Sequence, residues 1–190
     1  MGRKLTTVLV ALVTAAGLVG AAAPAGASTR HGHGHGRHQA GYTRVVVAPP
    51  VYQLIAGAGI APAPLDGAKA APFKGTLAAK FPISGYTLRE LRIKHTGGLS
   101  LTAGTATIEL RNFYIDLARG YVSAKVRGTI GDVGRVDLFR IAVSDRQDLG
   151  LVRLKLTATA AGALNTTFGV SAFAAGGTFG YATPRPGARF

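Results

Sequence analysis

The sequence lacks cysteine and tryptophan, and aromatic residues make up only 7% of its 190 positions. Without cysteine there can be no disulfide and no lipid-modified cysteine, so a hydrophobic core must hold the fold. Few aromatic side chains are available for base stacking, and we expect no nucleic acid partner. The length fits one domain.

Acidic residues are also scarce, since 8 Asp and Glu face 22 Lys and Arg, for a formal net charge of +14. Such an excess favours contact with polyanions, which outside a cell are anionic cell-envelope polymers. The alternative interpretation is that the charge only keeps the protein soluble.

Enzyme signatures are missing as well. The sequence has no His-Glu-x-x-His or Gly-x-Ser-x-Gly motif. Asp132 with Asp137, and Asp145 with Asp148, could form carboxylate pairs, but they fall in or beside expected turns, where Asp commonly bonds its own backbone. We therefore expect a noncatalytic protein.

The first 27 residues have the pattern of a cleavable signal peptide. Arg3 and Lys4 precede an apolar run that ends at the small residues around Ala27. A membrane anchor is the alternative, but threonine and glycine interrupt the run. We expect cleavage after Ala27, no membrane span in the remaining chain, and a secreted, extracellular protein that is either released or held at the cell wall only by charge.

Residues 28–41 form a His/Gly-rich tract with almost no apolar side chain to bury, and we expect disorder there. Its imidazoles are close enough along the chain to share a divalent metal ion, which makes this tract the candidate metal site: His31, His33, His35 and His38. The next segment, residues 42–74, is rich in Ala, Pro and Gly and is interpreted as an extended arm, with a short helix near residues 52–58.

From residue 75 to 183, short apolar runs alternate with glycine-containing turns, which predicts an all-β domain. The expected architecture is an antiparallel meander, either a sandwich or a partly open barrel, with one short helix at 158–168 and a disordered tail at 184–190. Strands are expected at residues 76–81, 88–95, 99–103, 106–117, 121–128, 136–143 and 151–157.

Alternation within these strands assigns their faces. Leu91, Ile93 and His95 share one apolar face, and basic residues occupy the other. In residues 106–117 the apolar phase shifts between Leu110 and Phe113, which predicts a bulge near Arg111 and Asn112.

His95 is the most informative polar residue on an apolar face. It precedes Gly97 and Gly98, where a backbone can approach a ligand closely. Two interpretations remain open: a buried histidine whose nitrogens bond within the protein, or a ligand to a planar cofactor.

Four segments carry a family resemblance: IKHTGGLSL at 93–101, the strands of 106–128, LTATAAGALN at 156–165 and SAFAAG at 171–176. Together they resemble the HtaA-type domain of secreted or surface-anchored actinobacterial proteins, some of which take part in haem capture. The resemblance implies a haem-binding role for His95, and adds Tyr86, Tyr114 and Tyr121 as further cofactor-binding residues. In this sequence Phe173 stands where the family has a tyrosine.

Two functions follow. The first is a secreted, noncatalytic β-rich protein that binds a ligand, with haem as the named cofactor. The alternative is an envelope-associated structural or adhesion protein that holds anionic cell-wall polymers through its basic face.

Overall fold

The computed structural model describes residues 41–87 and 89–190. The predicted signal peptide and the candidate metal-binding histidines His31, His33, His35 and His38 lie outside these residues. The described chain folds into eleven strands and two helices: β1 (Gly41–Val47), α1 (Pro49–Gly57), β2 (Ala61–Leu65), β3 (Lys69–Phe73), β4 (Thr76–Thr87), β5 (Arg92–His95), β6 (Gly98–Ala103), β7 (Ala106–Asp116), β8 (Tyr121–Gly128), β9 (Gly134–Val143), β10 (Val152–Leu156), α2 (Ala158–Phe168) and β11 (Thr178–Pro186).

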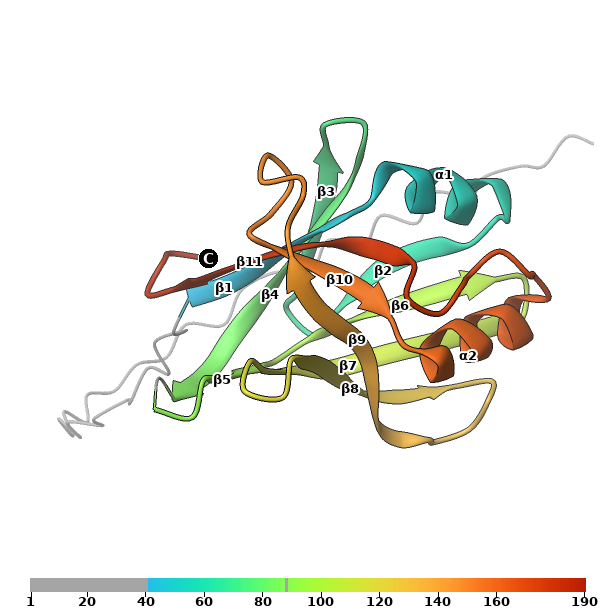
Figure 1. The fold of residues 1–190 in the computed structure, drawn as a ribbon. Helices are drawn as coiled ribbons and strands as arrows, with labels where there is room; N and C mark the ends of the chain where they lie inside the picture. The colour runs from blue at the N-terminus through green and yellow to red at the C-terminus, as the bar shows by residue number, and fades with distance from the viewer. Residues whose placement is uncertain (1–40, 88) are drawn as a thin grey trace, which may run out of the picture. The chain divides into compact units, whose positions relative to one another are not determined.

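Eight of these strands close into an antiparallel barrel, in the order β7, β5, β4, β1, β11, β10, β9 and β8, with β8 pairing back to β7. The predicted all-β antiparallel class is confirmed, and the sheet closes into a barrel where a sandwich or a partly open barrel was expected from the sequence. Three strands lie outside the ring, because β6 pairs with the first half of β7, β2 with β6, and β3 with β4. Figure 1 shows both helices at the end of the domain opposite the β4–β5 turn.

The predicted bulge in β7 is confirmed. Between Arg111 and Tyr114 the pairing with β8 shifts register, and Asn112 has a φ of 52°. The shift returns Phe113 to the interior, where it is 9% exposed. Leu117, expected on the same face, is 40% exposed because the strand ends at Asp116.

Strand β5 is shorter than predicted. It begins only at Arg92, because Leu91 lies in a turn with a φ of 53° and is 50% exposed. The inward alternation of Ile93 and His95 is confirmed, since both side chains are buried.

The predicted arm at residues 42–74 is instead part of the domain. Strand β1 lies between β4 and β11, and its residue Val46 is fully buried. A strand that is covered on both faces has no polar side to alternate with, so its continuous Val45–Val47 run does not look like an amphipathic strand. Helix α1 begins at Pro49, a position where proline fits because the first helical N–H groups have no partner within the helix.

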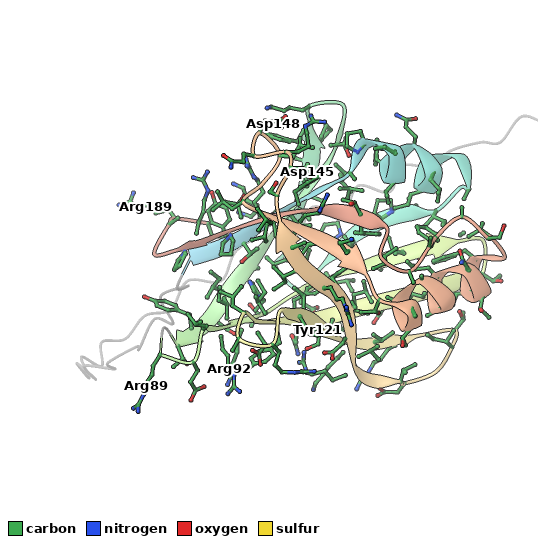
Figure 2. The ribbon with its side chains drawn as sticks, viewed as in Figure 1. Arg89, Arg92, Tyr121, Asp145, Asp148 and Arg189 are labelled. Atoms are coloured by element: carbon green, nitrogen blue, oxygen red, sulfur yellow. The ribbon has the colours of Figure 1, made fainter. Side chains whose placement is uncertain are left out.

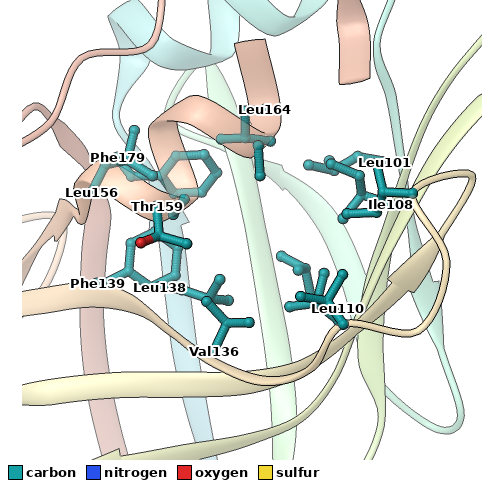
Figure 3. Close-up of a pocket in the computed structure, with 15 residues that line it drawn as sticks. Leu101, Ile108, Leu110, Val136, Leu138, Phe139, Leu156, Thr159, Leu164 and Phe179 are labelled. Atoms are coloured by element: carbon teal, nitrogen blue, oxygen red, sulfur yellow. The ribbon is translucent and has the colours of Figure 1, made fainter. Parts of the chain in front are cut away.

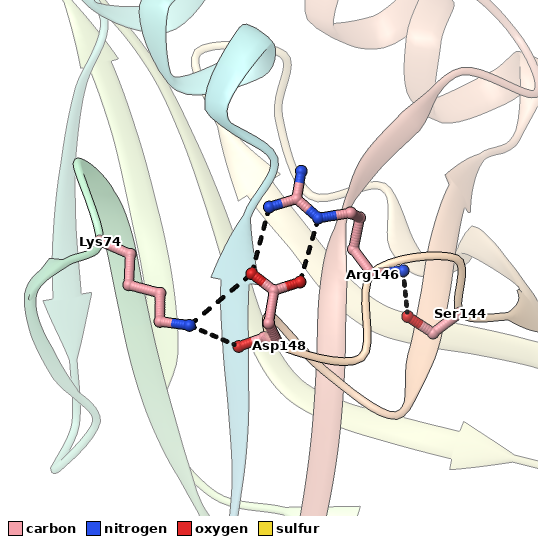
Figure 4. A network of polar contacts seen from close by, with 4 residues as sticks. All are labelled: Lys74, Ser144, Arg146 and Asp148. Carbon is pink, nitrogen blue, oxygen red and sulfur yellow. Dashed lines mark hydrogen bonds and ion pairs between the residues drawn. The ribbon is translucent and has the colours of Figure 1, made fainter.

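The outer cover of β1 is a small second core formed by the loop that follows β9. Leu149 in this loop is 2% exposed and packs with Val46, Ala48 and Tyr181. Within the same loop, Arg146 donates to both carboxylate oxygens of Asp148, as Figure 4 shows. Lys74 of the β3–β4 turn then holds the loop, because its Nζ donates to the Asp148 carbonyl at 3.4 Å.

The C-terminal helix α2 has the predicted limits. The Thr157 hydroxyl accepts a hydrogen bond from the N–H of Ala160, and Gly169 ends the helix in the left-handed conformation. The domain continues beyond its predicted limit of residue 183, because β11 pairs with β1 as far as Pro186. Past Ala182 this strand has no partner on its β10 side, so prolines are tolerated there.

Candidate ligand-binding site on the outer face of β4, β5 and β7

His95 lies at the end of β5 with its ring inside the barrel, 4% exposed. Its Nδ1 is 3.0 Å from the carbonyl oxygen of Phe113, and its Nε2 is 2.7 Å from the hydroxyl oxygen of Thr43. Because a carbonyl can only accept, Nδ1 carries the proton, and Nε2 accepts from the Thr43 hydroxyl. Both ring nitrogens are therefore already bonded within the protein.

Burial lowers the pKa of His95 from 6.5 to about 4, and the bond to the Phe113 carbonyl opposes this shift only in part. The ring is thus neutral at neutral pH, which agrees with the tautomer that its neighbours require. To coordinate a metal, Nε2 would have to give up the Thr43 hydroxyl. This geometry matches the interpretation of His95 as a satisfied buried histidine.

The enclosed space inside the domain is small. A cavity of about 60 Å³ lies beside His95 among apolar side chains that include Phe81, Phe113 and Phe179. A second cavity of about 60 Å³ lies beneath α2, where Leu164 faces Leu110 and Leu138, as Figure 3 shows. Sites for ligands of drug or cofactor size usually measure about 300 to 1,000 Å³. Neither cavity can therefore hold a large planar cofactor.

A larger space lies on the outside of the same strands. This Tyr114 hollow has a volume of about 440 Å³. Its lining comes from the end of β5, the β7 bulge and the start of β9: Ser84, Lys94, His95, Thr96, Asn112, Phe113, Tyr114 and Arg135.

The β7 bulge positions Arg135 in this hollow. The guanidinium donates to the Asn112 carbonyl at 3.0 Å and to the Ser123 hydroxyl at 3.2 Å, and its central carbon lies 5.9 Å from the centre of the Tyr114 ring. Asn112 has the left-handed backbone conformation of the bulge. The register shift that returns Phe113 to the core therefore also supplies the carbonyl that holds Arg135.

A second hollow of about 220 Å³ adjoins the first, and Lys94 and Tyr114 line both. Tyr86, 46% exposed, and Arg92 belong to this smaller space. Arg92 donates to Glu90 at 3.0 Å and lies 3.5 Å from the buried carboxylate of Asp116. In Figure 2 Arg92 projects outward near the β4–β5 end of the domain, together with Arg89.

No family model and no curated protein matches this sequence. Two solved structures do match, each with a TM-score of 0.50. The haem-binding protein HtaB from Corynebacterium glutamicum is 14% identical over 74% of this chain and 88% of its own. The C-terminal domain of HtaA from the same organism is 13% identical over 74% of this chain and 93% of its own. The chain has an HtaA-type fold. At this identity the likeness concerns the fold alone.

Within this HtaA-type fold, three of the four residues predicted to bind a cofactor lie close together. Tyr114 lines both hollows, while His95 lines the larger and Tyr86 the smaller. Tyr121 belongs elsewhere, in a hollow of about 550 Å³ between β8, β9 and the start of α2, where its ring lies 5.5 Å from the guanidinium of Arg140.

Sequence reasoning missed the cations of the Tyr114 hollow. Lys94 was assigned only to a general basic face, and Arg135 was not singled out. The signal that could have found Arg135 is the predicted bulge, because a bulge turns a backbone carbonyl away from its ladder. The candidate carboxylates are held in ion pairs with arginines: Asp132 with Arg127, Asp137 with Arg119, Asp145 with Arg153 and Asp148 with Arg146.

Two features are absent from the described residues. Residues 41–87 and 89–190 contain no group of three or more His, Cys, Asp or Glu side chains that could hold a metal ion. Across the same residues, no helix is both long and apolar enough to cross a membrane.

Proposed function

We propose that this chain is a noncatalytic haem-binding protein and that haem docks in the Tyr114 hollow. The observation that carries the proposal is the position of Tyr114 between two adjoining outer hollows, beside Lys94, Arg92 and Arg135. Tyrosine is one of the protein ligands of haem iron, and the surrounding cations can pair with the haem propionates. The haem-binding description of HtaB, which shares the fold, supports the same ligand.

Tyr114 replaces His95 as the proposed iron ligand. Both nitrogens of His95 are engaged inside the barrel, whereas no hydrogen bond from another described residue occupies the Tyr114 hydroxyl. His95 instead acts as a positioning residue: its ring donates a hydrogen bond to the carbonyl of Phe113 in β7, the residue directly before Tyr114, and so holds this part of β7 in place.

Hemin titration of the processed chain tests the proposal. The four tract histidines would be changed to alanine in every sample, so that the tract cannot bind hemin. We expect a shift of the Soret band that is lost in Tyr114→Phe and retained in the matched variant Tyr121→Phe. If Tyr114→Phe binds hemin like its parent while His95→Gln does not, haem binds at His95 and the proposed site is wrong.

We propose that the first 27 residues direct export and that His31, His33, His35 and His38 bind a divalent metal such as Zn²⁺ or Cu²⁺. Mass spectrometry of protein from the culture medium should give an amino terminus at Ser28. Calorimetric titration with Zn²⁺ should give heat that disappears when the four histidines are replaced.

A further inference from the structure

The acidic side chains of this chain are all engaged. The sequence has eight Asp and Glu, the structure describes every one of them, and each forms an ion pair with Lys or Arg. These pairs use seven basic residues: Lys74, Arg92, Arg111, Arg119, Arg127, Arg146 and Arg153. No other lysine or arginine among the described residues lies within ion-pairing distance of an Asp or Glu.

One cluster of these other cations lies on the outer face of three neighbouring strands. Lys69 of β3 is directly opposite Lys80 of β4, and Lys80 is directly opposite Arg44 of β1. Paired residues of antiparallel strands project to the same face, and like charges in this arrangement destabilise a sheet. We call Lys69, Lys80 and Arg44 the cation row.

Aromatic rings hold each member of the cation row in place. The Arg44 guanidinium lies 4.9 Å from the centre of the Phe73 ring, Lys80 Nζ lies 4.7 Å from that of Tyr42, and Lys69 Nζ lies 4.5 Å from that of Phe190. A ring orients a cation without neutralising it. The row is therefore ordered but still fully charged. Because these rings already carry a cation, they are poor platforms for nucleic acid bases.

The row ends at two polar atoms that lack partners. Arg44 is directly opposite Thr183 of β11, and both Arg44 Nε and the Thr183 hydroxyl are buried without a hydrogen-bond partner among the described residues. Buried polar groups nearly always have partners in folded proteins. The Nε–H can only donate and the hydroxyl is able to donate, so an oxygen acceptor satisfies both.

We propose that the cation row and Thr183 bind an extended polymer of phosphate groups. Adjacent strands lie about 4.8 Å apart, so the row presents a line of cations across β3, β4 and β1 that suits closely spaced anions. Several oxygens on one phosphate allow it to accept from Arg44 Nε and Thr183 together while it faces Lys80. This surface involves none of the residues that line the two hollows beside Tyr114.

Inorganic polyphosphate is the probe, titrated at several salt concentrations into the processed chain, its variants and a matched control. The row variant removes the cation row and combines Lys69→Gln, Lys80→Gln and Arg44→Gln. The control combines Arg89→Gln, Lys125→Gln and Arg140→Gln, which removes the same charge from three scattered cations. We expect the row variant to lose at least about tenfold in affinity and to reduce the slope of log K against log salt by about two.

Arg44→Lys gives a second test that keeps the charge but removes the Nε donor. It should weaken polyphosphate binding severalfold, and all variants should bind hemin like the parent. Equal losses in the row variant and the control would overturn the proposal, because net charge alone would then explain binding. Row-dependent binding to vesicles of an anionic phospholipid without binding to polyphosphate would also overturn it, in favour of a membrane surface.

Discussion

Protonation of His95 should make the domain sensitive to mild acid. The folded-state pKa of His95 is lowered to about 4 from 6.5, because the ring is buried among apolar side chains. Between these two values the unfolded chain takes up a proton that the folded chain does not, so the free energy of unfolding decreases as the pH falls below 6.5. Below about pH 4 His95 is protonated in the folded protein as well, and the free energy of unfolding stops decreasing on account of this residue.

The size of this effect follows from the same two values. At about 1.4 kcal/mol for each pKa unit, the difference between 6.5 and about 4 corresponds to about 3 kcal/mol. For a domain whose total stability is on the order of 5 to 15 kcal/mol, this is a substantial fraction. Most of the loss should be present at pH 4.5.

Urea denaturation at pH 7.5 and pH 4.5 measures this loss in the free energy of unfolding, with His95→Gln as the matched variant. Glutamine is neutral at both pH values, and its amide can donate to the Phe113 carbonyl and accept from the Thr43 hydroxyl. The parent should lose about 2 to 3 kcal/mol more than His95→Gln between the two pH values. Parallel losses in both proteins would refute the reasoning, because they would show that His95 is not the group that titrates.

Two further predictions concern packing. Leu149→Ala should lower the free energy of unfolding by about 2 to 4 kcal/mol, because this side chain is 2% exposed in the second core. Leu151→Ala is the control, since this side chain is 60% exposed and its loss should change the free energy of unfolding by less than about 0.5 kcal/mol. Equal effects in urea denaturation would mean that the loop after β9 does not pack on β1. Gly98→Ala should cost about 2 kcal/mol or more, because an added Cβ would collide with the Leu110 carbonyl on β7, while Gly85→Ala meets open space and serves as the control. Thermal denaturation of the two alanine variants compares them directly, and a Gly98→Ala protein as stable as the Gly85→Ala protein would contradict the β6–β7 pairing.

Much of the fold could be predicted from local patterns. The limits of α2 follow from a capping threonine, a helical apolar spacing and a terminal glycine, all within one short segment. The β7 bulge could be predicted because a phase shift in alternation is visible in a single strand. Strand β1 could not, because its burial on the outer face depends on Leu149, which comes from a loop about a hundred residues later in the chain.

The candidate site divides in the same way. Burial of His95 could be predicted from alternation in its own strand, and it is confirmed. Its bond to Thr43 could not, because the two residues meet only when β1 takes its place in the barrel. Arg135 reaches Tyr114 only through the pairing of β8 with β9 and of β7 with β8, which no local pattern specifies.

The position of β1 also affects the order in which the protein can fold. Closure of the ring requires the first strand to pair with the last, Gly41 with Pro186 and Val47 with Gly180. Contacts between such distant parts of a chain form slowly, because loop-closure entropy is lost before the contacts are gained. A ribosome or an export channel that still holds the C-terminal strand therefore prevents closure. For a chain with the export leader proposed at residues 1–27, late closure of the barrel keeps the polypeptide unfolded enough to pass through an export channel until strand β11 is released.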